Sequence, residues 1–125
     1  MANPELFDIS VDTQYLDEQS RPGEEQFVFA YTIRIKNNGD QGAQLLNRHW
    51  FITDAHGKVQ EVKGEGVVGE QPFIGAGESF QYTSGAILTT PVGTMQGSYQ
   101  MCDEFGIHFD TIIPLFSLAK PGSLH

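Results

Sequence analysis

Apolar and polar residues alternate along most of this chain with the period of two that is typical of β-strands. In the clearest run, residues 27–35, every second position holds a large apolar side chain: Phe27, Phe29, Tyr31, Ile33 and Ile35. Because alternate side chains of a strand point to opposite faces, this run predicts a half-buried strand with Ile33 at its centre. Residues 37–40, Asn-Asn-Gly-Asp, then have the composition of a turn.

The same pattern predicts six further strands, over residues 7–15, 44–54, 58–64, 79–84, 94–103 and 107–116. Residues 16–26 are polar, include Pro22-Gly23, and are expected to form a mobile loop. No stretch of eleven or more residues has the periodicity of a helix. Short strands separated by turn signals predict an all-β chain folded as an antiparallel two-sheet sandwich of about seven or more strands. Pro114 marks an edge or a bulge in the last strand.

The core of this sandwich is predicted from the apolar faces of the strands. We expect these residues to be mostly buried: Phe29, Tyr31, Ile33, Trp50, Tyr99 and Phe109. Arg48 shares the period-two face of Trp50 and Leu46, so it is expected to pair with a carboxylate at a sheet margin. A length of 125 residues suits one domain over 1–125, with residues 118–125 expected to be a disordered tail.

The excess of negative charge on the chain excludes some classes of binding partner. A formal net charge of -9 disfavours direct binding to nucleic acid and to acidic membrane surfaces. Basic protein surfaces and cations remain as partners, the cations held weakly by the excess of carboxylates. The single cysteine, Cys102, excludes an intrachain disulfide. The first residues lack the basic and apolar segments of a signal peptide, and we expect a cytoplasmic protein without membrane insertion.

Residues 64–69 contain the spelling G-x-G-x-x-G, which in other proteins marks a phosphate site. There the glycines lead into a helix whose N-terminus binds the phosphate, whereas here Glu70-Gln71-Pro72 follows and cannot begin such a helix. We therefore explain the glycines by backbone geometry, as a strand that bulges and turns. Val67 and Val68 are predicted either to pack inward or to form an apolar patch for a partner.

Metal and nucleophile chemistry have weak support in the sequence. His49 and His56 flank a predicted turn and His108 shares a strand face with Asp110, yet no local group supplies three or four convergent ligands. Ser84 lacks the surroundings of a nucleophile elbow. The acidic neighbour Asp103 disfavours a thiolate at Cys102. We expect no catalytic residue, no cofactor and no bound metal.

Several segments together resemble the ApaG family, which is called CorD in some bacteria. They are Arg48-His49-Trp50, the string Gly64-x-Gly66-Val67-Val68-Gly69-Glu70-Gln71-Pro72, Gly77-Glu78, Phe80-x-Tyr82-Thr83-Ser84-Gly85, Met95-x-Gly97-x-Tyr99-x-Met101 and Phe116-Ser117-Leu118. The long glycine string is the most specific of these, and the resemblance covers nearly the whole chain.

The resemblance implies a sandwich of the immunoglobulin or fibronectin type III kind. It also implies a small bacterial protein associated with cobalt resistance and magnesium efflux. Related domains occur in eukaryotic F-box proteins and in a polymerase-interacting protein, where they resemble protein-binding modules. The family has no agreed catalytic residues, so the resemblance assigns none here.

We therefore predict a non-enzymatic binding or regulatory protein. The predicted binding loop comprises Gly64, Glu65, Gly66, Val67, Val68, Gly69, Glu70, Gln71 and Pro72, because loops on a rigid sandwich commonly carry function. Two alternatives stay open at this point. One is a protein that binds divalent cations directly, and the other is nucleotide or pyrophosphate binding or hydrolysis through the glycines.

Overall fold

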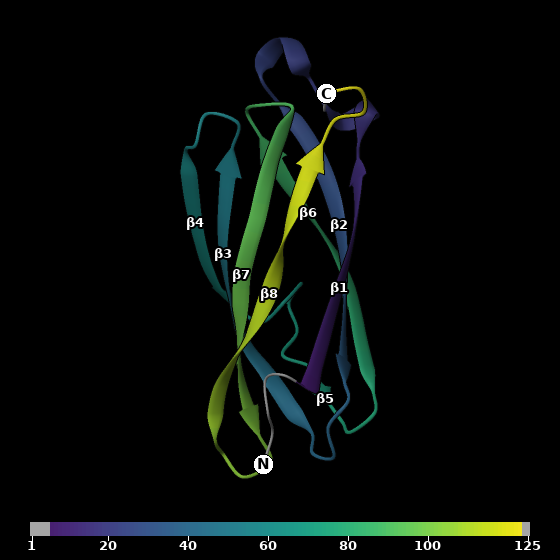
Figure 1. Ribbon diagram of the computed structural model, residues 1–125, viewed down its shortest axis with the longest axis vertical. Helices are drawn as coiled ribbons and strands as arrows, with labels where there is room; N and C mark the ends of the chain where they lie inside the picture. Colours follow the sequence, from purple (N-terminus) through teal and green to yellow (C-terminus); the bar gives the residue numbers. More distant parts are fainter. Residues whose placement is uncertain (1–5, 124–125) are drawn as a thin grey trace.

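The computed structural model describes residues 6–123, which form an all-β domain (Figure 1). In chain order its strands are β1 (Phe7–Tyr15), β2 (Phe27–Asn37), β3 (Ala43–Asp54), β4 (Val59–Glu65), β5 (Phe73–Ile74), β6 (Ser79–Leu88), β7 (Val92–Asp103) and β8 (His108–Ala119). Two short 3-10 helices, η2 (Asp17–Gln19) and η3 (Pro22–Glu24), lie between β1 and β2. Within residues 6–123, no helix is long and apolar enough to cross a membrane.

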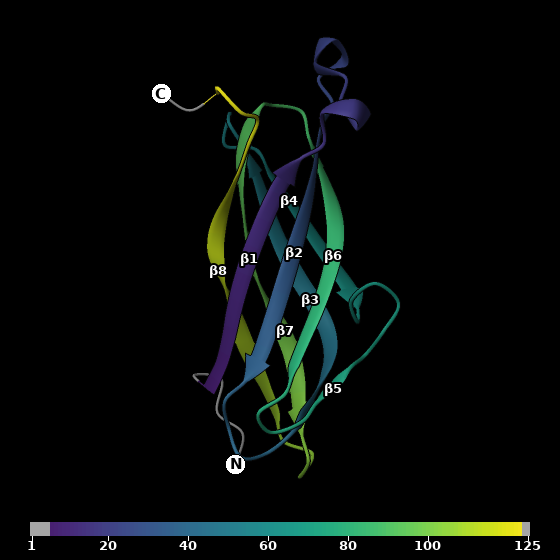
Figure 2. The ribbon, with the colours of Figure 1, turned by 90° about the vertical axis from the view of Figure 1, so that its right-hand side faces the viewer.

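The strands form two antiparallel sheets packed face to face (Figure 2). One sheet has the order β1-β2-β6, and the other has the order β4-β3-β7-β8 with the short β5 also paired to β3. In Figure 2 the three-stranded sheet lies in front of the larger sheet. The prediction of an all-β antiparallel sandwich is therefore confirmed.

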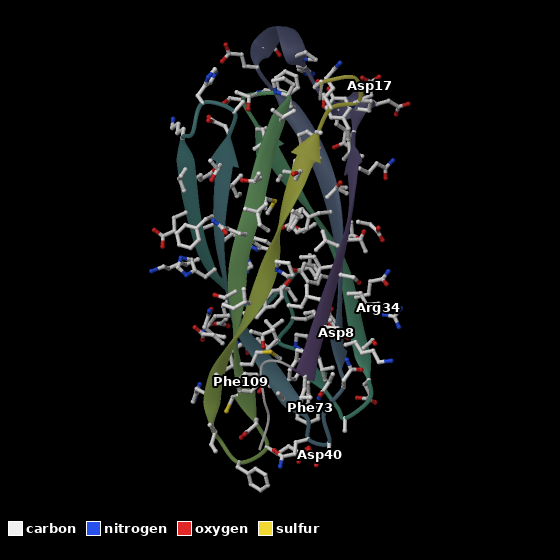
Figure 3. The ribbon with its side chains drawn as sticks, viewed as in Figure 1. Asp8, Asp17, Arg34, Asp40, Phe73 and Phe109 are labelled. Carbon is white, nitrogen blue, oxygen red and sulfur yellow. The ribbon has the colours of Figure 1, made fainter. Side chains whose placement is uncertain are left out.

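The pattern that predicts β2 also explains its position at the centre of its sheet. Ile33 and Ile35 are completely buried, whereas Arg34 between them is exposed and points away from the sandwich (Figure 3). Of the six predicted core residues, five are buried. Phe109 is only half-buried, because it lies near the beginning of β8 and packs there against Phe7, with ring centroids 5.8 Å apart.

Trp50 joins the two sheets at the middle of the core. The residue is 2% exposed, and its ring meets Tyr31 of the opposite sheet edge to face at a centroid distance of 5.6 Å. The ring of Phe116 lies 5.9 Å away on its own side. Such perpendicular aromatic contacts suit the quadrupoles of the rings and fill the space between the sheets.

Two β-bulges change the side-chain pattern within the larger sheet. The register of β3 and β7 shifts between Leu45 and Asn47, so Leu45 and Trp50 are both buried although they are five positions apart. Leu46 falls in this bulge. The prediction that Leu46 shares one strand face with Arg48 and Trp50 is therefore wrong for Leu46. The register of β7 and β8 shifts opposite Pro114, as the proline predicted.

The last strand, β8, continues further along the chain than the sequence predicted. Leu118 lies in β8 and is fully buried, so the prediction of a disordered tail beginning at 118 is wrong. The strand continues because Leu118 fills a core position. Just beyond it, the N–H of Lys120 donates to the carbonyl of Pro91 at 2.8 Å. Residues 124–125 of the predicted tail lie outside the described range.

The segment between β1 and β2 is irregular, as predicted, and has internal hydrogen bonds. Arg21 and Gln26 exchange backbone hydrogen bonds of 2.7 and 3.1 Å. The hydroxyl of Ser20 donates to the carbonyl of Leu16 and accepts from the N–H of Val28. The mobility of this segment stays a prediction.

Candidate functional site

The segment from Gly64 to Pro72, called the glycine loop below, connects the end of β4 to β5. Its tip is a tight turn in which the N–H groups of Val67 and Glu70 donate to each other's carbonyls at 2.8 and 2.9 Å. The two residues between them, Val68 and Gly69, have φ values of 42° and 80°. A pair of central residues with positive φ is the signature of a type I′ hairpin turn.

The glycines of the motif have structural reasons that need no phosphate. Gly66 has a φ of 63°, and a Cβ there would lie 2.2 Å from the carbonyl oxygen of Glu70. A Cβ on Gly64 would lie 2.6 Å from the guanidinium carbon of Arg48. Gly69 needs positive φ for the turn. The prediction that backbone geometry explains these glycines is confirmed for Gly66 and Gly69, whereas Gly64 leaves room for the Arg48 side chain.

Hydrogen bonds to β3 hold the glycine loop in place. The carbonyl of Leu46, at the β-bulge, accepts from the N–H of Gly66 at 2.8 Å and from Nε2 of Gln71 at 2.9 Å. The N–H of Leu45 donates to the carbonyl of Pro72 at 2.9 Å. The bulge thus presents to the loop backbone groups that a regular ladder would have used.

Arg48 supports the loop from within the sandwich. Its Nη1 donates to the carbonyls of Glu65 and Gly66, at 3.0 and 2.9 Å, and its guanidinium lies over Gly64, where a side chain would exclude it. The prediction that Arg48 pairs with a carboxylate is therefore wrong, because its guanidinium donates to carbonyls of the loop backbone. No signal in the sequence alone indicates this contact, because the pairing of Arg48 with Gly64 is a property of the register between β3 and β4.

A cluster of tyrosines lies beside Arg48 between the sheets. The hydroxyls of Tyr82 and Tyr99 share a hydrogen bond, and Tyr31 of β2 pairs with Ser84 of β6 across the sheet. Burial is the main cause that raises the pKa of all three tyrosines above the ordinary value. These phenols are therefore neutral near pH 7 and are not nucleophiles.

The outer surface of the glycine loop combines an apolar tip with carboxylates. Val67 is 1% exposed and belongs to the core, whereas the adjacent Val68 is 55% exposed at the tip. Glu65 and Glu70 are exposed on the same loop. The expected inward packing is therefore found for Val67 alone, whereas Val68 is exposed at the tip.

The candidate metal ligands remain dispersed among residues 6–123, which contain no group of three or more His, Cys, Asp and Glu side chains able to hold a metal ion. His49 meets Glu61 at 2.5 Å on the outer face of β3 and β4. The hydrogen bond from His49 is the main cause that lowers the pKa of Glu61. His108 and Asp110 are both exposed on β8.

Among residues 6–123, no activating base is in hydrogen-bond contact with either candidate nucleophile. Ser84 is half-buried in the tyrosine cluster. The thiol of Cys102 is 3.6 Å from the carbonyl of Asp103, which is a weak contact. Neither arrangement provides the nucleophile and base that acyl transfer or hydrolysis would need.

Comparison with known proteins agrees with these features. The ApaG domain profile matches residues 17–103. Protein ApaG of Pseudomonas fluorescens is 60% identical over 94% of this chain and 94% of its own length. Protein ApaG of Thiobacillus denitrificans is 63% identical over 94% of this chain and 92% of its own length.

Solved structures show the same agreement. An X-ray structure of a structural genomics target superposes with a TM-score of 0.92 at 51% identity, covering 98% of this chain and 92% of that chain. The crystal structure of a putative ApaA protein from Bordetella pertussis gives a TM-score of 0.90 at 51% identity, covering 94% and 95% of the two chains. The chain therefore belongs to the ApaG domain family.

Proposed function

We propose that this protein is a non-enzymatic binding protein that recognises a partner protein through the glycine loop. The observation that carries the proposal is Val68, a β-branched residue with a φ of 42° whose side chain is 55% exposed. Left-handed backbone costs a residue with a Cβ about 1–2 kcal/mol, and Gly would fit the same turn without that cost. Strain of this kind is concentrated at functional sites, so an exposed valine held there is best explained by a contact that it makes.

The anchoring of the loop supports recognition with little loss of entropy. Arg48 and the Leu46 carbonyl hold the loop through four hydrogen bonds, three to the backbone of Glu65 and Gly66 before the tip and one to the side chain of Gln71 after it. A binding surface that is ordered before the partner arrives avoids the entropic cost of ordering it on association.

The charge near the tip favours a basic partner surface. Glu65 and Glu70 flank Val68, and the whole chain has a net charge of -9. Opposite charge on the partner would raise the rate of association and help to orient the complex.

The proposal is tested by capture of the cellular partner with Val68→Asp as bait. Because Val68 is exposed, we expect the variant to stay folded, as checked by circular dichroism and urea unfolding, and to lose the partner. Ile112→Asp is the matched control: Ile112 is 70% exposed on β8, away from the loop, and we expect that variant to retain the partner. Retention of every partner by a folded Val68→Asp variant, and by a folded variant carrying Glu65→Lys and Glu70→Lys, would refute the proposal.

A further inference from the structure

The free edge of β6 lacks the features that protect the other long sheet edges. β6 is the last strand of its sheet, and its ten residues, Ser79–Leu88, include no charged residue and no proline. The other edge strands carry such residues: Asp8 and Asp12 in β1, Glu61, Lys63 and Glu65 in β4, and Asp110 and Pro114 in β8. Charges and prolines on an edge prevent another chain from pairing with it. β6 alone among these edges is open to an added strand.

The backbone of β6 is suited to such an addition. The strand pairs with β2 in unbroken register from Ser79 to Leu88, and no bulge interrupts this pairing. In an antiparallel pair, alternate residues direct both the N–H and the carbonyl away from the partner strand. On the side away from β2, these groups form a regular row over the length of the strand.

The glycine loop lies on the same side of the sandwich. Figure 2 shows the segment between β4 and β5 projecting on the β6 side of the three-stranded sheet. Arg48 connects the two regions, because it donates to the carbonyls of Glu65 and Gly66 and is near enough to Tyr82 of β6 to act on that hydroxyl electrostatically. A strand added to β6 would therefore lie on the side of the sandwich that carries the loop.

The charges on this side indicate the chemistry of the added strand. Glu65 and Glu70 are exposed on the loop, and Glu78 is exposed immediately before β6, while β6 itself is neutral. Arg34 and Lys36 belong to β2, where they pair with Gln81 and Ser79 and are exposed on the outer face of the sheet. We propose that the free edge of β6 accepts an extended, basic segment of a partner protein as an additional β-strand, with basic side chains directed toward the loop carboxylates. This inference rests on the proposed function in taking the partner to be a protein, and it names the segment that would be bound.

The first test uses synthetic peptides of ten residues and the full chain. One peptide alternates Lys with Val and Thr, a second replaces each Lys with Glu, and a third is the basic peptide with two central prolines. Backbone amide NMR with hydrogen exchange would follow each titration. We expect only the first peptide to bind and to slow exchange along β6. Absence of binding at millimolar peptide, or protection along β1, β4 or β8 instead, would overturn the proposal.

The second test uses matched substitutions on the two edges of the same sheet. Gln81 and Ile87 are exposed on β6, and Ser10 and Gln14 are exposed on β1. We expect Gln81→Lys with Ile87→Lys to weaken binding of the basic peptide at least tenfold, and Ser10→Lys with Gln14→Lys to change it less than twofold. Equal effects on both edges would show general charge attraction and would refute strand addition.

Two further outcomes separate this proposal from the alternatives. If light scattering shows a dimer that Gln81→Lys with Ile87→Lys dissociates, a second copy of this chain occupies the edge and the proposal is overturned. If the basic peptide protects β6 while Val68→Asp and the variant carrying Glu65→Lys and Glu70→Lys both retain the cellular partner, the loop hypothesis fails and strand addition stands. If the peptide gives no protection while Val68→Asp loses the partner, strand addition fails and the loop hypothesis stands.

Discussion

Replacing Gly66 by alanine tests whether the glycine motif is a structural device. Gly66 and Gly69 both have positive φ, at 63° and 80°, so alanine at either position meets the same backbone cost. The positions differ in what a Cβ would touch. At Gly66 it would lie 2.2 Å from the carbonyl oxygen of Glu70, whereas at Gly69 no atom lies within 4 Å. Gly69→Ala is therefore a matched control within one loop.

The magnitudes follow from these contacts. Left-handed backbone costs alanine about 1–2 kcal/mol, which is the whole effect expected for Gly69→Ala. At Gly66 the Glu70 carbonyl must also move by about 1 Å to reach ordinary contact, since carbon and oxygen do not approach closer than about 3.2 Å. That movement breaks the 2.8 Å hydrogen bond from Val67 to Glu70 and displaces the buried Val67 side chain. With these losses, Gly66→Ala should cost about 3–6 kcal/mol.

Equilibrium unfolding in urea, followed by the fluorescence of the single buried Trp50, measures both variants. We expect a much larger decrease in the midpoint for Gly66→Ala than for Gly69→Ala, with similar slopes. Equal losses would mean that the loop adapts freely to a side chain at 66. Backbone crowding would then not explain why glycine stands there, and a ligand requirement would become the better explanation.

Further predictions concern the core, the tyrosines and ligand binding. Ile33→Ala should lower the free energy of unfolding by about 2–5 kcal/mol and Arg34→Ala by less than about 0.5 kcal/mol, and similar urea midpoints would contradict the assignment of faces. Burial raises the pKa of Tyr31, Tyr82 and Tyr99 in the folded state. Their contribution to stability is therefore complete below about pH 10, the pKa of an unfolded tyrosine, and is lost as the pH rises above it. A melting temperature that stays constant from pH 9 to pH 11 would refute this. Calorimetry should detect no tight ATP or GTP binding, and a micromolar affinity would revive the phosphate hypothesis. Elemental analysis of the purified protein should find no stoichiometric zinc or cobalt, and divalent ions should associate weakly and be displaced by salt.

The sequence by itself determined the strands whose two faces differ. In β2, alternation between Ile33 and Arg34 assigned the buried and exposed faces correctly, because a side-chain period of two is a local property of extended backbone. The same local information gave the turn glycines and the bulge at Pro114. Trp50 was assigned to the core by its position on a predicted strand and by its size, since so large an apolar side chain is seldom left in water.

Other features depended on contacts between distant residues. Leu118 lies in a short final segment that has no clear alternation of apolar and polar residues. It is nevertheless fully buried, because it pairs with β7 and belongs to the core. The two-residue β5 is too short to have a periodicity, and its pairing with β3 fixes it. The partner of Arg48 was likewise decided by the path of the glycine loop, which brings two carbonyls to the guanidinium.

The candidate site combines both kinds of information. Its residues were found from the sequence, because the glycines and valines between 64 and 72 form an unusual string. Which valine faces solvent was decided only by the tertiary structure: the β3 bulge and Arg48 fix the loop so that Val67 enters the core and Val68 occupies the exposed tip. The open edge of β6 is also a property of sheet order, because a strand's own sequence does not state whether a neighbour pairs with it. Local patterning thus sets which segments extend and which faces are apolar, and long-range packing sets which groups are left for a partner.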